Sequence, residues 1–97
     1  MRDWLRVRLE SVQTDILFAY IYGSSLRSDT DPRDVDIILV TMFEAGSASW
    51  ERVRAFSRPL RQEFIKAFGL PLSLMIATPS EWSEIDGVVV RERADLR

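Results

Sequence analysis

The chain has 97 residues, of which 46% are hydrophobic and 29% charged, and its formal net charge is -2. This length fits a single domain, residues 1–97, rather than two. No apolar run approaches the roughly 20 residues of a membrane-spanning helix. Charged residues interrupt the first ten positions, where a secretory signal would be apolar. We therefore expect a cytoplasmic protein with no membrane contact.

The chain contains no cysteine and no histidine. Disulfides, thiol nucleophiles, Cys/His zinc sites and imidazole bases are thereby excluded. Any chemistry must use carboxylates, hydroxyls, backbone amides and metal ions. The 13 basic residues are 12 arginines and one lysine, and they form no continuous basic stripe. Direct binding to nucleic acid is therefore not expected.

The first part of the chain predicts a helix followed by two strands. A helix is expected over residues 3–15, with Asp3 as its cap. Continuous apolar runs over residues 16–22 and 35–40 predict buried strands, and the segment between them is rich in Gly, Ser, Asp and Pro, as turns are. One face of the helix carries apolar residues at helical spacing: Leu5, Leu9, Val12 and Ile16.

Residues 47–68 carry a second, longer helical stripe, which contains Trp50, Val53, Phe56, Leu60, Phe64 and Phe68. Pro59 lies inside this stretch and removes one helical hydrogen bond. We therefore expect either a kink near Arg58 or two helices in series. Gly69 fits the end of the helix, because glycine accepts the left-handed conformation common there.

The last part of the chain predicts a strand over residues 72–77, then a short helix, then a fourth strand at residues 87–91. Thr78 and Glu81 fit a capping box at the start of this helix. The element order predicts an α/β or α+β fold, with helices packed on a small sheet.

A Gly-Ser pair, Gly23-Ser24, follows the first apolar strand. Glycine has no Cβ, so a phosphate group can approach its backbone closely. Free N–H groups in a helical turn after Ser24 would point at that phosphate, and the hydroxyl of Ser24 adds a further donor. The pair alone is common and carries little information.

The second strand opens with Asp34-Val35-Asp36, and nine residues separate Ser24 from Asp34. Because side chains alternate across a strand, both carboxylates face one side and Val35 faces the other. Two adjacent carboxylates repel each other unless a cation lies between them. Oxygen ligands in this pattern suit Mg²⁺. The combination of Gly-Ser, a short polar connection and Asp-x-Asp predicts a site for a metal–nucleoside triphosphate.

Other charged residues lie in the connection between the two strands. Asp29 and Asp31, together with Asp34, can equally be solvated loop acids around Pro32. Arg27 and Arg33 fit either a position near the triphosphate or a solvated loop. The sequence alone leaves these alternatives open.

The segment from Tyr22 to Val40 resembles the signature of the DNA polymerase beta superfamily, in which Gly-Ser is followed after a short connection by Asp-x-Asp. It is most similar to the minimal nucleotidyltransferases, whose domain has about this length. The resemblance implies the nucleotidyltransferase fold, with a small mixed β-sheet and helices packed on it. It also implies transfer of a nucleoside monophosphate to an acceptor hydroxyl, with a nucleoside triphosphate, expected to be ATP, as donor.

The resemblance also implies roles for individual residues. Gly23 and Ser24 would bind the triphosphate, and Asp34 and Asp36 would be the catalytic carboxylates that hold Mg²⁺. The family normally supplies a third carboxylate from the strand after the long helix. Here that strand reads LSLMIA, and its one polar residue is Ser73.

The loss of the third carboxylate affects binding and catalysis differently. In a two-metal phosphoryl transfer, one ion accompanies the triphosphate and the other activates the attacking hydroxyl. The second ion depends on the third carboxylate, which Ser73 does not replace. The nearest acids are Glu63, in the preceding helix, and Glu81, in the capping box. We therefore expect binding of the Mg²⁺–nucleotide complex to survive better than catalysis.

Two functions from different classes stay open. The first is a slow nucleotidyltransferase, and the second is a catalytically degenerate module that binds nucleotide or a protein. Minimal nucleotidyltransferases commonly pair with a helical protein, sometimes as an antitoxin that modifies a toxin, so the resemblance implies such a partner. Homo-oligomerisation also stays open. Trp4, Trp50 and Trp82 are expected on three different helices, in the core or, if exposed, in an interface.

Overall fold

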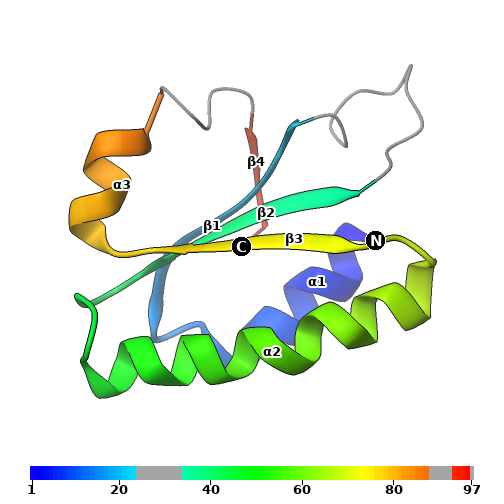
Figure 1. Cartoon of the computed structure of the whole chain (residues 1–97), viewed down its shortest axis with the longest axis horizontal. Helices are drawn as coiled ribbons and strands as arrows, with labels where there is room; N and C mark the ends of the chain where they lie inside the picture. The colour runs from blue at the N-terminus through cyan, green and yellow to red at the C-terminus, as the bar shows by residue number, and fades with distance from the viewer. Residues whose placement is uncertain (24–33, 88–92, 97) are drawn as a thin grey trace.

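The computed structural model describes residues 1–23, 34–87 and 93–96. Three α-helices and four strands make up this part of the chain (Figure 1). In chain order the elements are α1 (Arg2–Leu9), a 3-10 turn η1 (Glu10–Val12), β1 (Ile16–Tyr22), β2 (Val35–Thr41), α2 (Ala48–Phe68), β3 (Leu72–Ala77), α3 (Pro79–Ile85) and β4 (Arg93–Asp95).

The four strands form one mixed sheet in the order β3-β2-β1-β4. β1 is antiparallel to both β2 and β4, whereas β2 and β3 are parallel. A parallel pair needs a crossover connection, and α2 supplies it between β2 and β3. The structure is therefore an α+β fold with helices on a small mixed sheet, as expected from the sequence.

The sheet is covered by helices on both faces. α1 and α2 lie on one face, and α3 lies on the other (Figure 1). Alternate residues of β2 serve the two layers: Val35, Ile37 and Leu39 join the core under α1 and α2, while Ile38 and Val40 pack with Trp82 of α3. A strand that is buried on both faces has a continuous apolar sequence, which is why residues 35–40 lack polar alternation beyond Asp36.

The larger core lies between the sheet and the α1–α2 layer. The predicted stripe of the first helix is buried there, and α2 contributes Val53, Leu60 and Phe64. The ring of Phe64 meets that of Trp4 edge-on, with 5.7 Å between ring centroids. Through these contacts α1 and α2 pack against each other on the same face of the sheet.

The first helix is shorter than expected and has a different cap. It begins at Arg2 with Met1 as its N-cap, so the prediction that Asp3 is the cap was wrong. Asp3 lies in the first turn, where a carboxylate interacts favourably with the helix dipole, and it pairs with Arg6 at 3.2 Å. The α-helix ends at Leu9, and the chain continues to Val12 as a 3-10 turn.

α2 runs as one helix through Pro59, so the alternative of two helices in series was wrong. Burial of Leu60 and Phe64 on the sheet side compensates for the hydrogen bond that proline cannot donate. Ser47 caps the start by accepting a hydrogen bond from the N–H of Trp50 at 3.1 Å. Gly69 ends the helix with a φ of +69°, as predicted.

For the last part of the chain, the predictions of β3 and α3 were correct, and a fourth strand is present. Thr78 and Glu81 form the expected capping box. The fourth strand was expected at residues 87–91, of which 88–91 lie outside the described residues. In the structure β4 begins at Arg93 and pairs with the end of β1.

A buried polar junction joins the start of β1 to the start of α2. Asp15, which precedes β1, accepts hydrogen bonds from the hydroxyl of Ser49 at 2.8 Å and from the guanidinium of Arg52 at 2.7 Å. These hydrogen bonds hold the pKa of Asp15 below its usual value, and the one from Arg52 contributes most.

None of the helices in the described ranges is long and apolar enough to cross a bilayer.

Replacing Phe64 by alanine tests the α1–α2 core. Phe64 is fully buried, so Phe64→Ala should reduce the free energy of unfolding by about 3–5 kcal/mol. The neighbouring Ile65 is 48% exposed, and Ile65→Ala should change it by only about 0.5 kcal/mol. Urea denaturation of both variants measures the difference, and equal effects would contradict this account of the core.

The Asp15 junction predicts a pH dependence of stability. A carboxyl whose folded pKa is depressed stabilises the fold above its unfolded pKa, and this contribution disappears as pH falls through the folded pKa. Below about pH 4, wild type should therefore lose unfolding free energy more steeply than Asp15→Asn, which lacks this ionisation. Denaturation curves at several acidic pH values test this, and parallel pH profiles for the two proteins would disprove the role of Asp15.

Candidate functional site

The candidate site lies where β2, an inner strand, begins, and therefore at one end of the sheet. Val35 is fully buried towards α1 and α2. Asp36, the next residue, therefore points to the opposite face, the one that carries α3. Asp34 immediately precedes the strand, and both aspartates are half-buried. β1 places Tyr22 beside Asp36 on one side.

On the other side of Asp36, β3 places Ser73 in register with it. The Ser73 hydroxyl acts on the carboxylate of Asp36 and lowers its pKa. The two acids considered as substitutes for the missing carboxylate are engaged elsewhere. Glu63 pairs with Arg8 at 2.7 Å, and Glu81 accepts a hydrogen bond from the N–H of Thr78 at 3.0 Å. The side chain that neighbours Asp36 from β3 is thus a neutral hydroxyl.

Gly23 lies directly against the carboxylate of Asp36. Its φ is +80°, and a Cβ built on it would lie 2.9 Å from Oδ2 of Asp36. Any larger residue would therefore meet both an unfavourable backbone conformation and the carboxylate. The sequence assigned Gly23 to close approach of a phosphate, and the structure adds that the glycine makes room for Asp36.

Negative charge is concentrated at this end of the sheet. Burial raises the pKa of Asp36, the nearby charge of Asp34 raises it further, and the polar hydroxyl of Ser73 opposes both effects. Burial also raises the pKa of Tyr22, with added contributions from Asp36 and then Asp34. A cation bound at the two carboxylates would relieve this repulsion.

The residues present fit one hard divalent cation. Mg²⁺ is commonly held by one or two carboxylates plus phosphate oxygens and water, and Asp34 and Asp36 are of that type. Within the described ranges, no group of three or more His, Cys, Asp or Glu side chains could hold a metal ion. Ser24, Arg27, Asp29, Asp31 and Arg33 lie outside these ranges.

Tyr22 is a site residue that the sequence reasoning did not single out. Its position follows from the antiparallel register, which pairs it with Asp36. A reading of each strand separately cannot supply that register. The sequence does carry one signal, because Tyr22 immediately precedes Gly23. Its neighbour Ile21 is fully buried in the α1–α2 core, so the side chain of Tyr22 points to the opposite face of the sheet.

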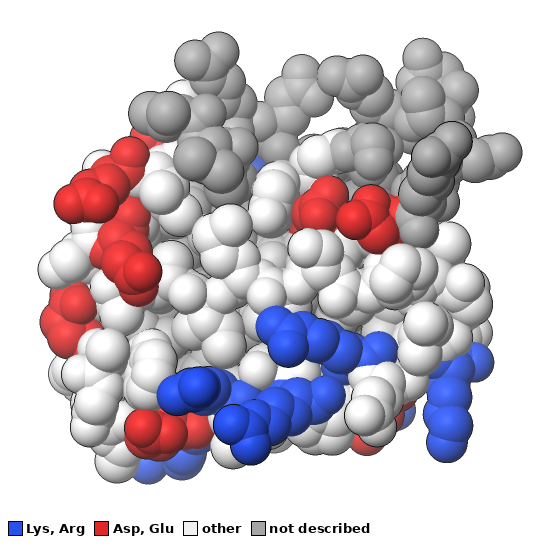
Figure 2. Space-filling view, viewed as in Figure 1, with Lys and Arg blue, Asp and Glu red and all other residues white. Residues whose placement is uncertain are grey.

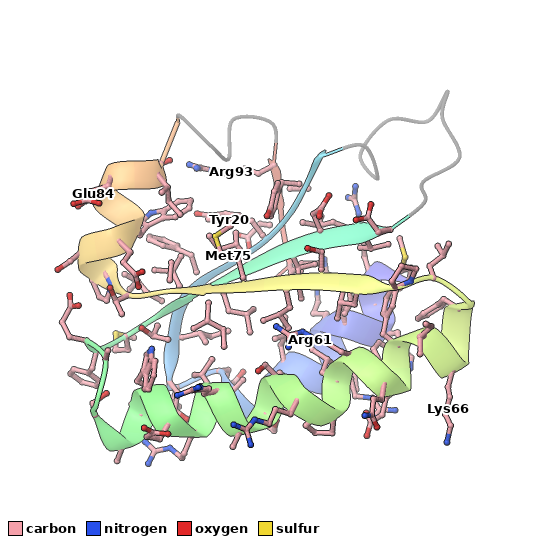
Figure 3. The ribbon with its side chains drawn as sticks, viewed as in Figure 1. Tyr20, Arg61, Lys66, Met75, Glu84 and Arg93 are labelled. Carbon is pink, nitrogen blue, oxygen red and sulfur yellow. The ribbon has the colours of Figure 1, made fainter. Side chains whose placement is uncertain are left out.

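An aromatic cluster lies on the same face, further along the strands. The ring of Tyr20 stacks on that of Trp82 at 5.6 Å, and the guanidinium of Arg93 lies 4.6 Å from the Tyr20 ring centroid (Figure 3). Trp82 is buried, so packing accounts for it. Trp4 and Trp50 are half-buried. The three tryptophans do lie on three different helices, as expected.

The electrostatics of the site can be tested by titrating Asp36. Asp34→Asn removes one of the charges that raise the pKa of Asp36 and should lower it. Ser73→Ala removes the hydroxyl that favours the ionised carboxylate and should raise the pKa of Asp36. Carbon-13 NMR of the Asp36 carboxyl group measures both shifts. Shifts in the same direction, or none, would contradict the described arrangement.

Comparison with protein-family models gives no match, and no curated protein matches the chain. Solved structures do resemble it. A "putative nucleotidyltransferase" from Sulfolobus solfataricus superposes with a TM-score of 0.60 at 19% identity, over 98% of this chain and 78% of that one. A second "putative nucleotidyltransferase" gives a TM-score of 0.55 at 20% identity, over 98% of this chain and 96% of that one.

A mutant of the toxin-antitoxin MntA-HpeT also resembles the chain, with a TM-score of 0.66 at 13% identity, over 100% of this chain and 73% of that one. At these identities the likeness establishes the fold. The chain therefore has the fold of a minimal nucleotidyltransferase domain, which confirms the fold expected from Gly23, Asp34 and Asp36 and from the order of elements.

Proposed function

We propose that the chain is a nucleotidyltransferase-like domain that binds a Mg²⁺–nucleoside triphosphate and, on its own, transfers the nucleotide slowly or not at all. The observation that carries this proposal is the surroundings of Asp36. The backbone of Gly23 lies against its carboxylate, the charge of Asp34 acts on it, and the neutral hydroxyl of Ser73 is its partner from β3.

The binding half of this function uses residues that the chain has. Asp34 and Asp36 hold the cation, and the Gly23-Ser24 turn binds the phosphates of a nucleoside triphosphate, for which ATP is the expected donor. Bound Mg²⁺ would neutralise phosphate charge and the repulsion between the two aspartates. A cytoplasmic location, with its supply of Mg²⁺ and ATP, fits this assignment.

The catalytic half is weakened at Ser73. Transfer of a nucleoside monophosphate needs the acceptor hydroxyl to lose its proton, and a carboxylate can accept it. Ser73 is neutral, and a hydroxyl is not a base strong enough to take this proton. The chain has no histidine to take over the role of base. Efficient transfer therefore requires a group from outside this chain.

The second candidate function is a domain that acts by association with another protein. It is favoured by the resemblance to a toxin-antitoxin protein together with the neutral residue at Ser73. In this case the nucleotide site would regulate or accompany binding of the partner rather than turn substrate over. A helical partner protein, of the toxin-antitoxin type, is the kind of partner that the resemblance implies.

Calorimetric titration of ATP with Mg²⁺ tests the binding half. Wild type should bind in a metal-dependent manner, and Asp34→Asn/Asp36→Asn should bind at least about tenfold more weakly, because the metal ligands are gone. Asp95→Asn, which removes one such charge on β4, serves as the control and should retain binding. Metal-independent binding, or equal affinity of the double variant, would refute the proposed site.

Replacing Ser73 by aspartate tests the catalytic half. Ser73→Asp restores a carboxylate beside Asp36 and should raise pyrophosphate release from ATP in the presence of acceptor proteins and Mg²⁺. Ser83→Asp makes the same chemical change on the exposed side of α3 and should leave the rate at the wild-type level. A sensitive assay that finds no gain for Ser73→Asp, or an equal gain for both variants, would remove Ser73 as the cause of weak catalysis.

A further inference from the structure

β3 is an edge strand of the sheet, and its outer edge faces away from β2. The strand order ends with β3, and no strand of the described ranges pairs with its outer edge. In Figure 1 this strand lies in front of β2 and β1, so the view looks onto the edge. An unpaired edge offers a row of N–H and C=O groups to an incoming strand.

The backbone groups that face outwards can be identified from three hydrogen bonds. The C=O of Pro71 accepts from Val35, and that of Ala77 accepts from the hydroxyl of Thr41, so both point towards β2. The C=O of Leu74 instead accepts from the guanidinium of Arg61 at 2.9 Å. Because the backbone groups of successive residues point to opposite sides of a strand, the outward set belongs to Leu72, Leu74 and Ile76.

The edge lacks most features that protect edge strands from pairing. β3 is six residues long, regular, and without proline, charge or bulge in its interior. Among the described residues, the guanidinium of Arg61 donates to this edge at the C=O of Leu74 (Figure 3). A carbonyl oxygen has two lone pairs, so the C=O of Leu74 can accept from Arg61 and from an added strand together.

Charge differs on the two sides of this edge. Arg54, Arg58 and Arg61 follow one another at helical spacing along α2, and Glu51 precedes them in the first turn. Figure 2 shows basic side chains in a row over α2, below an uncharged band that runs across the middle of the view. The other side of β3 carries Met75, which is 37% exposed.

We propose that the outer edge of β3 binds an extended segment of a partner protein, by strand addition, and that this segment alternates acidic and apolar residues. Side chains of an added strand alternate between the two faces. Those on the α2 side meet the arginine row and are acidic. Those on the opposite side meet Met75 and are apolar.

This surface deepens the association function proposed above but does not depend on nucleotide binding. The edge is formed by the backbone of β3 and by side chains of α2, whereas the nucleotide site is formed by Gly23, Asp34 and Asp36. Failure of one assignment therefore leaves the other testable. The two meet at Ser73, which lies on β3 and contacts Asp36.

The experiment uses a synthetic peptide of alternating glutamate and valine, as long as β3, as a probe of the full chain. Amide exchange measured by NMR should slow at least about tenfold at Leu74 and Ile76 when the peptide saturates the protein. The amides of Ser73 and Met75 already bond to β2 and should not change. The corresponding lysine-valine peptide should bind more weakly, because it repels the arginine row.

Two charge reversals on α2 give a matched pair of variants. Arg61 points to β3, whereas Lys66 points away from the sheet at the far end of the helix (Figure 3). Arg61→Glu should weaken binding of the glutamate-valine peptide by about fivefold or more, and Lys66→Glu by no more than about twofold. The double variant Asp34→Asn/Asp36→Asn should bind the peptide as wild type does, which separates this test from that of the nucleotide site.

Several results would overturn the proposal. They are binding of the peptide without protection of Leu74 and Ile76, equal binding of the lysine-valine peptide, and equal losses for Arg61→Glu and Lys66→Glu. If the two edge amides are protected before peptide is added, and the protection depends on protein concentration, the occupant is a second copy of the chain and not an acidic segment. Protection of both amides with the expected order of affinities supports the proposal.

Discussion

The alternation of side chains along β2 is the constraint on which the rest of the structure depends. Val35, Ile37 and Leu39 fill the core under α1 and α2, while Asp36 and Ile38 face the other way. A shift by one residue would exchange these faces and bury a carboxylate in the apolar layer. The same strand therefore fixes both the packing of the helices and the position of the candidate site.

Much of the fold could be predicted from the sequence because its signals are local. The apolar runs 16–22, 35–40 and 72–77 became strands with nearly those bounds, and the capping box at Thr78 formed as expected. In the three strands, the apolar pattern of the sequence matches the burial of the side chains. The role of Gly69 was also correct, since few other residues accept its conformation.

The errors lie where tertiary packing outweighs local preference. Pro59 stays inside one helix because its neighbours on the same helix are buried against the sheet. Asp3 does not cap the first helix, which begins one residue earlier. A different limit applies to the final strand, because no apolar run marks Arg93–Asp95, which are defined by pairing with β1.

The candidate site could be predicted only in part, because local spacing places some of its residues and strand register places the others. Asp34 and Asp36 are two residues apart in sequence, so their proximity needs only the period of a strand. The contacts of Asp36 with Tyr22, Gly23 and Ser73 depend on strand register, which a single sequence does not specify. Ser73 could be named as the polar residue of its strand, but its place beside Asp36 required the structure.

We propose that Asp34 and Asp36 hold a divalent cation together with a nucleotide. The first test is to add Mn²⁺ and ATP and to measure paramagnetic broadening of the backbone amides, because this effect reports proximity to the ion itself. We expect strong broadening at Gly23, Asp36 and Ser73 and none at Lys66, at the far end of α2. Broadening centred on another acidic cluster, such as Glu44 and Glu81 near the start of α3, or no broadening at Asp36, would contradict it.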